Sequence, residues 1–128
     1  MVDGCGLPVR LLLTPGQASD KAVVAALLDG LAPAADTVGD RGYDAKAILK
    51  IITEHGSRPH IPTQRDRKNQ RSVDRKLYRQ RNLVERFFNK LKHFRRIATR
   101  YDKLARNFLA AVAIASCRIC IRHYESTT

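Results

Sequence analysis

The segment TVGDRGYDAKAILKIITEHGSRPHIPT, residues 37–63, contains the pattern that decides the fold class. Its start, near Thr37–Asp40, predicts a short strand. Residues 45–55 predict a helix that begins after Asp44, its expected N-cap, and ends at Gly56. Residues 58–63 predict another short strand, which two prolines place at a sheet edge. Because strand and helix alternate, we expect parallel pairing and an α/β fold.

The chain before this segment predicts a hairpin and a helix. The expected hairpin consists of the end of one strand at Val2, a turn at Asp3–Gly4 and a strand over Leu7–Thr14. Its first arm is short. Ser19 or Asp20 is then expected to cap a helix that continues to about Leu31.

The chain after it predicts a helical layer. Residues 64–81 hold eight Lys or Arg and begin as a loop, either a solvated tether or an arm at about 64–76 that contacts phosphates. Two helices follow, at about 75–96 and 103–122. We find no internal repeat or linker, so residues 1–128 are expected to be one domain.

The charge distribution favours a polyanionic partner. The 128 residues carry a net charge of +12, with 6 Lys and Arg against 7 Asp and Glu in residues 1–60, and 18 against 5 in residues 61–128. The basic half lacks a long apolar run and a lipidation motif, so nucleic acid is favoured over a membrane. We find no signal peptide and expect a cytoplasmic protein, associated with the nucleoid when bound to DNA.

The cysteines do not predict a disulfide framework. The chain has three, an odd number that suits a reducing compartment. Cys117, Cys120 and His123 are spaced by threes, which allows a zinc site, but a tetrahedral site needs a fourth ligand that we do not find. We therefore favour a role in helix packing.

Four residues of the helix expected at 75–96 predict chemistry. In a continuous helix, Tyr78, Arg81, Glu85 and Lys92 fall within a sector of about 60°. This face combines a carboxylate, which can bind a metal, with phosphate-binding cations and a phenol. Such a set suits the cleavage of nucleic acid. The alternative is an ordinary surface ion pair between Arg81 and Glu85, worth a few tenths of a kcal/mol.

The same helix carries an apolar stripe that we expect to be buried. It consists of Leu77, Val84, Phe88 and Leu91, and the other side carries Arg79, Arg86, Asn89 and Lys90. Glu85 is then expected at the edge of the buried face, where it can point into a cleft.

Asp40 is the second candidate carboxylate. It ends a predicted strand, and reactive groups in α/β sheets gather beyond the carboxyl ends of strands. Gly42 is expected to let the backbone turn there; a role of Asp40 as a cap or turn former is the alternative. Two-metal chemistry usually needs a third acidic ligand. Asp3, Asp20, Asp36 and Asp44 are candidates, and for each we favour a role in a turn or cap.

These residues resemble a known family. The spacing Tyr78-x2-Arg81-x3-Glu85-x6-Lys92 matches the signature Y-(2)-R-(3)-E-(6)-K of bacterial insertion-sequence DDE transposases of the IS-four and IS-five type. Residues 39–44, GDRGYD, look like the segment with the second acidic residue of those enzymes. Residues 13–20 are similar to the stretch between their third strand and first helix, and the likeness covers about residues 2–124.

The resemblance implies a ribonuclease-H-like mixed sheet with flanking helices, lacking the first strand or strands, and a C-terminal helical pair. It implies that Asp40 and Glu85 are the second Asp and the Glu of the catalytic triad, and that they bind Mg²⁺ or Mn²⁺. Arg81 and Lys92 would contact phosphates of transposon-end or target DNA, and Tyr78 would lie near the scissile end. Family members cleave a phosphodiester bond and join the freed 3′-hydroxyl to target DNA, as homo-oligomers when complete.

One part of the family pattern is missing. The first catalytic Asp of similar transposases lies upstream of the segment that residues 1–4 resemble, and Asp3 has a sufficient role in its turn. We therefore expect a C-terminal part of a transposase that is inactive alone, and whose partner is an upstream transposase half or a full-length enzyme.

Two further interpretations remain open. The chain can be a non-catalytic DNA-binding or regulatory transposase derivative, supported by the charge of residues 61–128. The last two helices can also form a helix-turn-helix repressor. Against the latter, the turn near 99–102 is basic and the last helix is expected to be buried.

Overall fold

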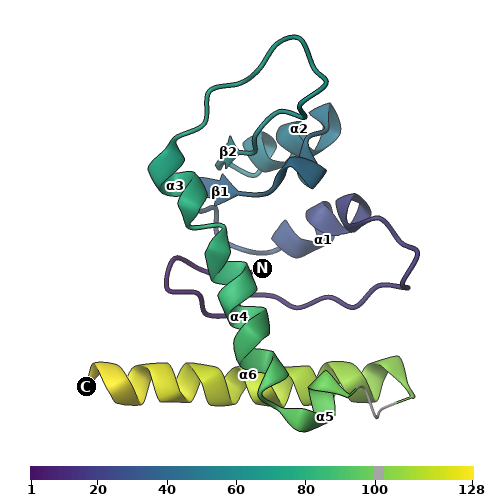
Figure 1. The fold of residues 1–128 in the computed structure, drawn as a ribbon, viewed down its shortest axis with the longest axis vertical. Coiled ribbons are helices and arrows are strands. Elements are labelled where there is room, and N and C mark those ends of the chain that lie inside the picture. The colour runs from purple at the N-terminus through teal and green to yellow at the C-terminus, as the bar shows by residue number, and fades with distance from the viewer. Residues whose placement is uncertain (100–102) are drawn as a thin grey trace. The chain divides into compact units, whose positions relative to one another are not determined.

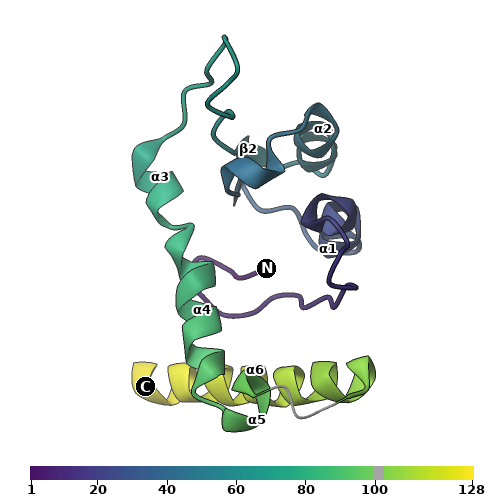
Figure 2. The ribbon, with the colours of Figure 1, turned by 45° about the vertical axis from the view of Figure 1, so that its right-hand side comes forward.

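The structure is a computed structural model that describes residues 1–99 and 103–128, which form two compact units. Residues 15–81 are called the sheet unit here, and residues 1–14 with 82–128 are called the helical unit. Figures 1 and 2 show the elements of both. Each unit buries apolar side chains of its own.

The sheet unit is built on one parallel strand pair. Strand β1 (Asp36–Val38) pairs with β2 (Arg58–His60), with Asp36 opposite Arg58 and Val38 opposite His60. Helix α2 (Lys46–Glu54) connects the strands and packs against β2. Its buried residues are Ile48 and Ile52, one turn apart. The mixed α/β class and the parallel pairing are confirmed, although both strands are shorter than predicted.

The sequence predicted both ends of α2, and only one of these predictions agrees with the structure. Gly56 ends the helix as predicted, with a φ of 90° that residues other than glycine rarely adopt. The prediction that Asp44 caps the helix is wrong. The N-cap is Ala45, which makes no side-chain cap, and Asp44 has another role.

Asp44 holds the basic arm, residues 64–76, against the rest of the sheet unit. Its carboxylate is fully buried; it accepts a hydrogen bond from the Gln64 backbone N–H at 2.8 Å and one from the Arg71 guanidinium. Arg67 Nε lies 3.2 Å from its Oδ2. These hydrogen bonds, that of Arg71 first, hold the pKa of Asp44 below its ordinary value. The beginning of the arm is therefore fixed, and only part of it can be a solvated tether.

The helix predicted to begin near Ser19 is shorter and less regular than expected. It consists of the 3-10 turn η1 (Asp20–Val23) and helix α1 (Val24–Leu28). Ser19 is the N-cap, as predicted: its hydroxyl accepts a hydrogen bond from the Lys21 N–H at 3.3 Å. Gly30, with a φ of 68°, follows the last turn.

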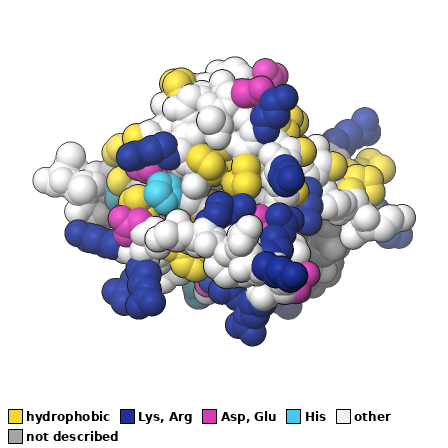
Figure 3. Space-filling model, turned by 90° about the horizontal axis from the view of Figure 1, so that it is seen from above, with side chains coloured by type: hydrophobic (Ala, Val, Ile, Leu, Met, Phe, Trp, Pro, Cys, Tyr) yellow, Lys and Arg dark blue, Asp and Glu magenta, His cyan; other side chains and the backbone are white. Residues whose placement is uncertain are grey.

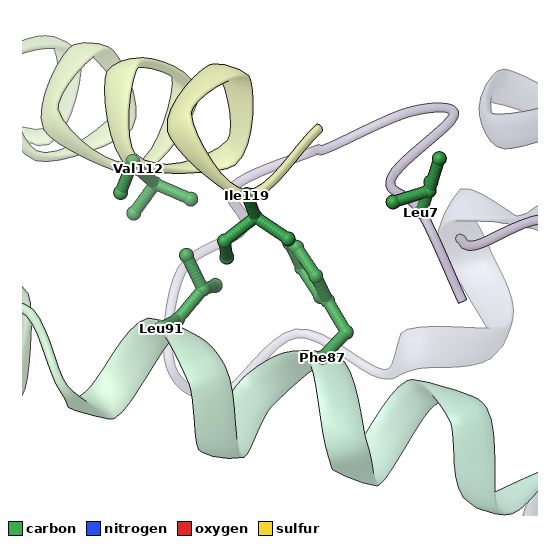
Figure 4. Close-up of a cluster of buried hydrophobic side chains, with 6 residues drawn as sticks. Leu7, Phe87, Leu91, Val112 and Ile119 are labelled. Carbon is green, nitrogen blue, oxygen red and sulfur yellow. The ribbon is translucent and has the colours of Figure 1, made fainter. Parts of the chain in front are cut away.

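The helical unit consists mainly of α4 (Asn82–Lys92), α5 (Arg95–Ala98) and α6 (Ala105–Thr127). Figures 1 and 2 show α4 meeting α6 crosswise, with α5 beside α6. Within the part of the chain that the structure describes, none of the helices is long and apolar enough to span a membrane. The core of the unit, part of which is labelled in Figure 4, contains Leu7, Phe87, Leu91, Val112, Ala115 and Ile119.

The stripe that α4 buries differs from the predicted one. Phe87 and Leu91 are 2% and 4% exposed and point toward Ile119 of α6 (Figure 4), whereas Phe88 is 53% exposed. The prediction that Phe88 is buried is therefore wrong. Because successive helical residues are about 100° apart, burying Phe87 turns Phe88 to the solvent side.

The predicted helix over 75–96 is interrupted. Helix α3 (Arg75–Arg79) ends before α4 begins, and α5 is separate. At the first break, the N–H groups of Gln80 and Arg81 donate to the carbonyls of Leu77 and Tyr78, three residues back. The connection predicted near 99–102 lies mostly outside the described residues.

The N-terminal hairpin is reduced to a single antiparallel bridge between Val2 and Pro8. As predicted, Asp3 forms the turn, and its Oδ1 accepts hydrogen bonds from the N–H groups of Cys5 and Leu7 at 2.9 Å. The strand predicted over Leu7–Thr14 is wrong, since this segment forms no ladder. A strand needs a partner along its length, and no neighbouring strand of the described chain pairs with it.

Candidate functional site

Asp40 lies in the sheet unit, after β1, and is exposed. It caps the 3-10 turn η2 (Arg41–Tyr43), where its Oδ1 accepts a hydrogen bond from the Gly42 N–H at 2.8 Å. A Cβ at position 42 would lie 2.8 Å from the same Oδ1. A side chain at position 42 would therefore displace the Asp40 carboxylate from this hydrogen bond, although no unusual φ is involved. The capping alternative is confirmed, and it leaves the carboxylate facing solvent.

Glu85 lies in the first turn of α4, in the helical unit, and is exposed. The prediction of a position at the edge of the buried face is wrong, because Glu85 is about 160° around the helix from Phe87. Lys92, seven residues later, shares its face and is exposed too. A carboxylate and an ammonium two turns apart thus stand on the side of α4 that faces away from the core.

Tyr78 and Arg81 belong to the sheet unit. Tyr78 is in α3 and Arg81 follows it in the turn before α4. The Arg81 guanidinium carbon lies 5.9 Å from the centre of the Tyr78 ring, a cation–π geometry. The structure therefore brings Tyr78 and Arg81 together in one unit, and Glu85 and Lys92 on one helix face in the other.

Neither unit contains, among its described residues, a complete set of ligands for the predicted metal site. Asp40 and Glu85 belong to different units, and among the described residues no three His, Cys, Asp or Glu side chains gather closely enough to hold a metal ion. Carboxylates are suitable ligands for Mg²⁺ and Mn²⁺, but one per unit is too few. The residues that each unit brings together do not fit such an ion.

Two of the other acidic candidates, Asp36 and Asp44, have structural roles. Asp36 is neither a turn former nor a cap, which corrects our expectation: it lies in β1, with His60 Nε2 2.8 Å and Arg58 Nε 3.0 Å from its Oδ1. The hydrogen bond from His60, followed by that from Arg58, lowers the pKa of Asp36. Asp44 is buried in its ion pairs, and the side chain of Asp20 lies outside the described part.

The structure also shows a cationic cavity that sequence reasoning missed. A cavity of about 400 Å³ in the helical unit is lined by residues of α4 and α6 and of the turn after α4. His123, considered above only as a zinc ligand, lines it, while Cys117 is exposed and Cys120 packs against the core. The spacing of basic residues on two separate helices was the only available signal. The basic lining residues are Lys90, His93, Arg122 and His123.

Comparisons with known proteins agree with the motif. The family described as "Transposase DDE domain" matches residues 1–120. The putative transposase for insertion sequence element IS6501 of Brucella ovis is 35% identical over 123 residues, covering 95% of each chain. The putative transposase for insertion sequence element IS402 of Burkholderia cepacia is 27% identical over 131 residues, covering 94% of this chain and 60% of that protein. No solved structure matches. The resemblance noted in the sequence is confirmed, and the chain belongs to the DDE transposase family.

Proposed function

We propose that the chain acts in the transposition of an insertion sequence, with Asp40 as the second Asp and Glu85 as the Glu of a DDE triad. The observation that carries this proposal is the family match over residues 1–120, which includes both positions and leaves few residues outside. Both side chains are exposed. In this proposal, the two units are parts of one ribonuclease-H-like catalytic domain.

The DNA contacts come from the basic half of the chain. Arg81 and Lys92 bind phosphates of transposon-end or target DNA, and Tyr78 packs near the scissile end. The arm at 64–76 contacts the backbone through side chains that Asp44 does not hold; Arg65, Lys68, Arg75 and Lys76 are exposed. Figure 3 shows Lys and Arg side chains at many separate points of one face, more numerous there than Asp and Glu.

The chain alone does not complete the triad in this proposal. Mg²⁺ or Mn²⁺ would supply the activation of the attacking oxygen and the stabilisation of the leaving oxygen. Such sites need three or more acidic ligands, and the family motif assigns two to this sequence. An upstream transposase half or a full-length transposase then supplies the missing carboxylate, in an assembly of more than one chain.

A cleavage assay tests this assignment. We expect the purified chain to leave duplex DNA carrying the ends of the insertion sequence uncut in the presence of Mg²⁺. Mg²⁺-dependent cleavage by the chain alone, lost in Asp40→Ala and retained in Asp66→Ala, would refute the proposed incompleteness. Asp66 is a suitable control because it is also exposed and lies outside the motif.

The second candidate function is DNA binding without cleavage, as a regulatory transposase derivative. The excess of 18 Lys and Arg over 5 Asp and Glu in residues 61–128 favours it. Binding of this kind occupies transposon ends or joins a full-length enzyme in an inactive assembly. Because both candidates leave DNA uncut when the chain is alone, the distinguishing assay adds a full-length transposase. Increased cleavage of the transposon ends favours the first candidate, and reduced cleavage favours the second.

Lys92→Ala should weaken DNA binding and make it less sensitive to salt. If Lys92 neutralises one phosphate, its loss should reduce the slope of log K against log salt by about 1. Gel-shift titrations of duplex DNA at several salt concentrations measure this slope. Lys50→Ala is the matched control, since Lys50 is exposed, pairs with Glu54 at 3.6 Å and lies in the acidic half. Equal slopes for both variants would exclude Lys92 from the interface.

A further inference from the structure

Helix α6 is buried on one side only. Val112, Ala115 and Ile119 pack into the core of the helical unit, whereas Ile114 is 72% exposed. The expectation that this helix is buried is therefore wrong for one of its faces. Beyond Ile119, the last turns of α6 carry basic side chains to the cavity of about 400 Å³ described above.

This cavity gathers basic side chains from two helices. Lys90 lies in the last turn of α4, and His93 lies in the turn that follows it. Arg122 and His123 come from α6, together with Ser126, whose hydroxyl donates to the His123 carbonyl at 2.8 Å. The two groups are distant in sequence, so only the packing of α4 on α6 brings them to one cavity.

The rest of the cavity lining is apolar. Phe94 is half-buried and Ile119 is 7% exposed. In the described part of the chain, the lining contains no carboxylate. Glu125 lies one turn from Arg122 on α6, but it is not among the lining residues. The positive charge of the cavity is therefore not balanced by its own lining.

A simpler explanation is that these cations only stabilise the ends of their helices. The C-terminus of a helix carries roughly half a negative charge, and both α4 and α6 end near the cavity. Two such ends amount to about one negative charge, which the charges of Lys90 and Arg122 together exceed. His93 and His123 can add to this excess. The cluster is therefore more basic than the helix ends require.

A phosphate group fits this lining better than a carboxylate does. Like charges around a recess repel one another unless an anion enters. A phosphate offers oxygens in several directions to donors that come from two helices, and a guanidinium can bind two of these oxygens at once. The cavity volume of about 400 Å³ is in the range of small-ligand sites.

We infer that the cavity binds one phosphate group through its basic side chains, which are Lys90, Arg122, His93 and His123. An imidazole gains its positive charge between about pH 8 and about pH 5. The affinity should therefore rise as the pH falls, because the two histidines then add to the permanent cations.

This site is separate from the family motif. Lys92 of the motif is about 200° around α4 from Lys90, so the two ammonium groups lie on different faces of the helix. The phosphate group can belong to DNA or to a free phosphorylated molecule, since the same side chains would bind either. The DNA source rests on the DNA binding proposed above, whereas the free source does not.

A sulfate titration tests the site without DNA. Sulfate resembles the phosphate dianion and keeps its charge between about pH 6 and about pH 8, so only the protein titrates in this range. At constant ionic strength and about pH 6, we expect Arg122→Gln to bind sulfate at least about tenfold more weakly than the wild type. Chemical shifts of the protein in NMR spectra measure the binding.

Arg106→Gln is the matched control. Arg106 is exposed on the same helix and does not line the cavity, so this variant should bind sulfate as the wild type does. Because Arg122 is also exposed, both variants should keep the fold, which circular dichroism checks.

A second comparison tests the histidines. The wild type should bind sulfate about tenfold more tightly at about pH 6 than at about pH 8. The double variant H93Q/H123Q should lose most of this difference. An unchanged pH dependence in the double variant would exclude the histidines from the site.

Gel-shift titrations of duplex DNA identify the source of the phosphate. If it belongs to DNA, Arg122→Gln should bind DNA more weakly than Arg106→Gln, and its slope of log K against log salt should be smaller by about 1. If it belongs to a free molecule, the two variants should bind DNA equally and differ only toward sulfate. Equal behaviour of both variants in both titrations would overturn the inference, and would leave the tests of Asp40 and Lys92 unaffected.

Discussion

Phe87→Ala should destabilise the helical unit by about 3–5 kcal/mol, a large part of the stability of an ordinary domain. The side chain of Phe87 is 2% exposed and points toward Ile119 of α6 (Figure 4). Removing its ring leaves a cavity in the core that Phe87 forms with Leu91, Val112 and Ile119. Urea denaturation followed by circular dichroism measures the loss.

The adjacent phenylalanine is the matched control. Phe88→Ala removes the same atoms at a position that is 53% exposed, and it should cost less than about 1 kcal/mol. Phe87→Leu, which retains part of the volume, should fall between the two and remain folded if Phe87→Ala does not. Equal costs at positions 87 and 88 would mean that α4 buries a different face.

Asp44→Asn should destabilise the sheet unit by about 2 kcal/mol at neutral pH, because it removes the charge that Arg67 and Arg71 surround. This expected loss is smaller than that for a fully buried ion pair, since the side chains of Arg67 and Arg71 are 40% and 38% exposed. Equilibrium unfolding in urea measures it. Asp66→Asn, at an exposed position in the segment that carries Arg67 and Arg71, should change stability little.

The pH dependence of the stability difference between the wild type and Asp44→Asn gives an independent check. The pKa of Asp44 is lower in the folded chain than its ordinary value of 3.8. A carboxyl with a depressed pKa stabilises the fold above its ordinary value, and this contribution disappears as the pH falls through the folded pKa. The difference in free energy of unfolding between the wild type and Asp44→Asn should therefore decrease below about pH 4. A gap that stays constant down to pH 3 would contradict the ionic role.

Local signals in the sequence were sufficient to predict the end of one helix and the start of another helical segment in the sheet unit. Gly56 ends α2, and Ser19 caps η1, because glycine and serine favour these positions through their own backbone and side-chain chemistry. The role of Asp44 could not be predicted in this way. Its partners Gln64 and Arg71 are 20 and 27 residues away, so only the folded chain brings them together.

The sequence motif supplies the candidate site residues, whose roles stay predictions, but it does not supply their geometry. The spacing of the motif identified Glu85, but the buried side of α4 depends on which of two adjacent phenylalanines packs against α6. We assumed one helix from 75 to 96, which aligned Leu77 with Phe88 and favoured the wrong side. The break at Gln80 and Arg81 contains neither proline nor glycine, so the sequence gives little indication of it.

The N-terminal segment that forms no ladder has a consequence for solubility. Val9, Leu12 and Leu13 are 46%, 45% and 39% exposed in an extended stretch whose backbone can pair with another molecule. Such a stretch is a site where chains at high concentration stack into insoluble aggregates. A lysine in place of Leu12 acts as a gatekeeper against this stacking, and should raise the soluble yield of the recombinant protein.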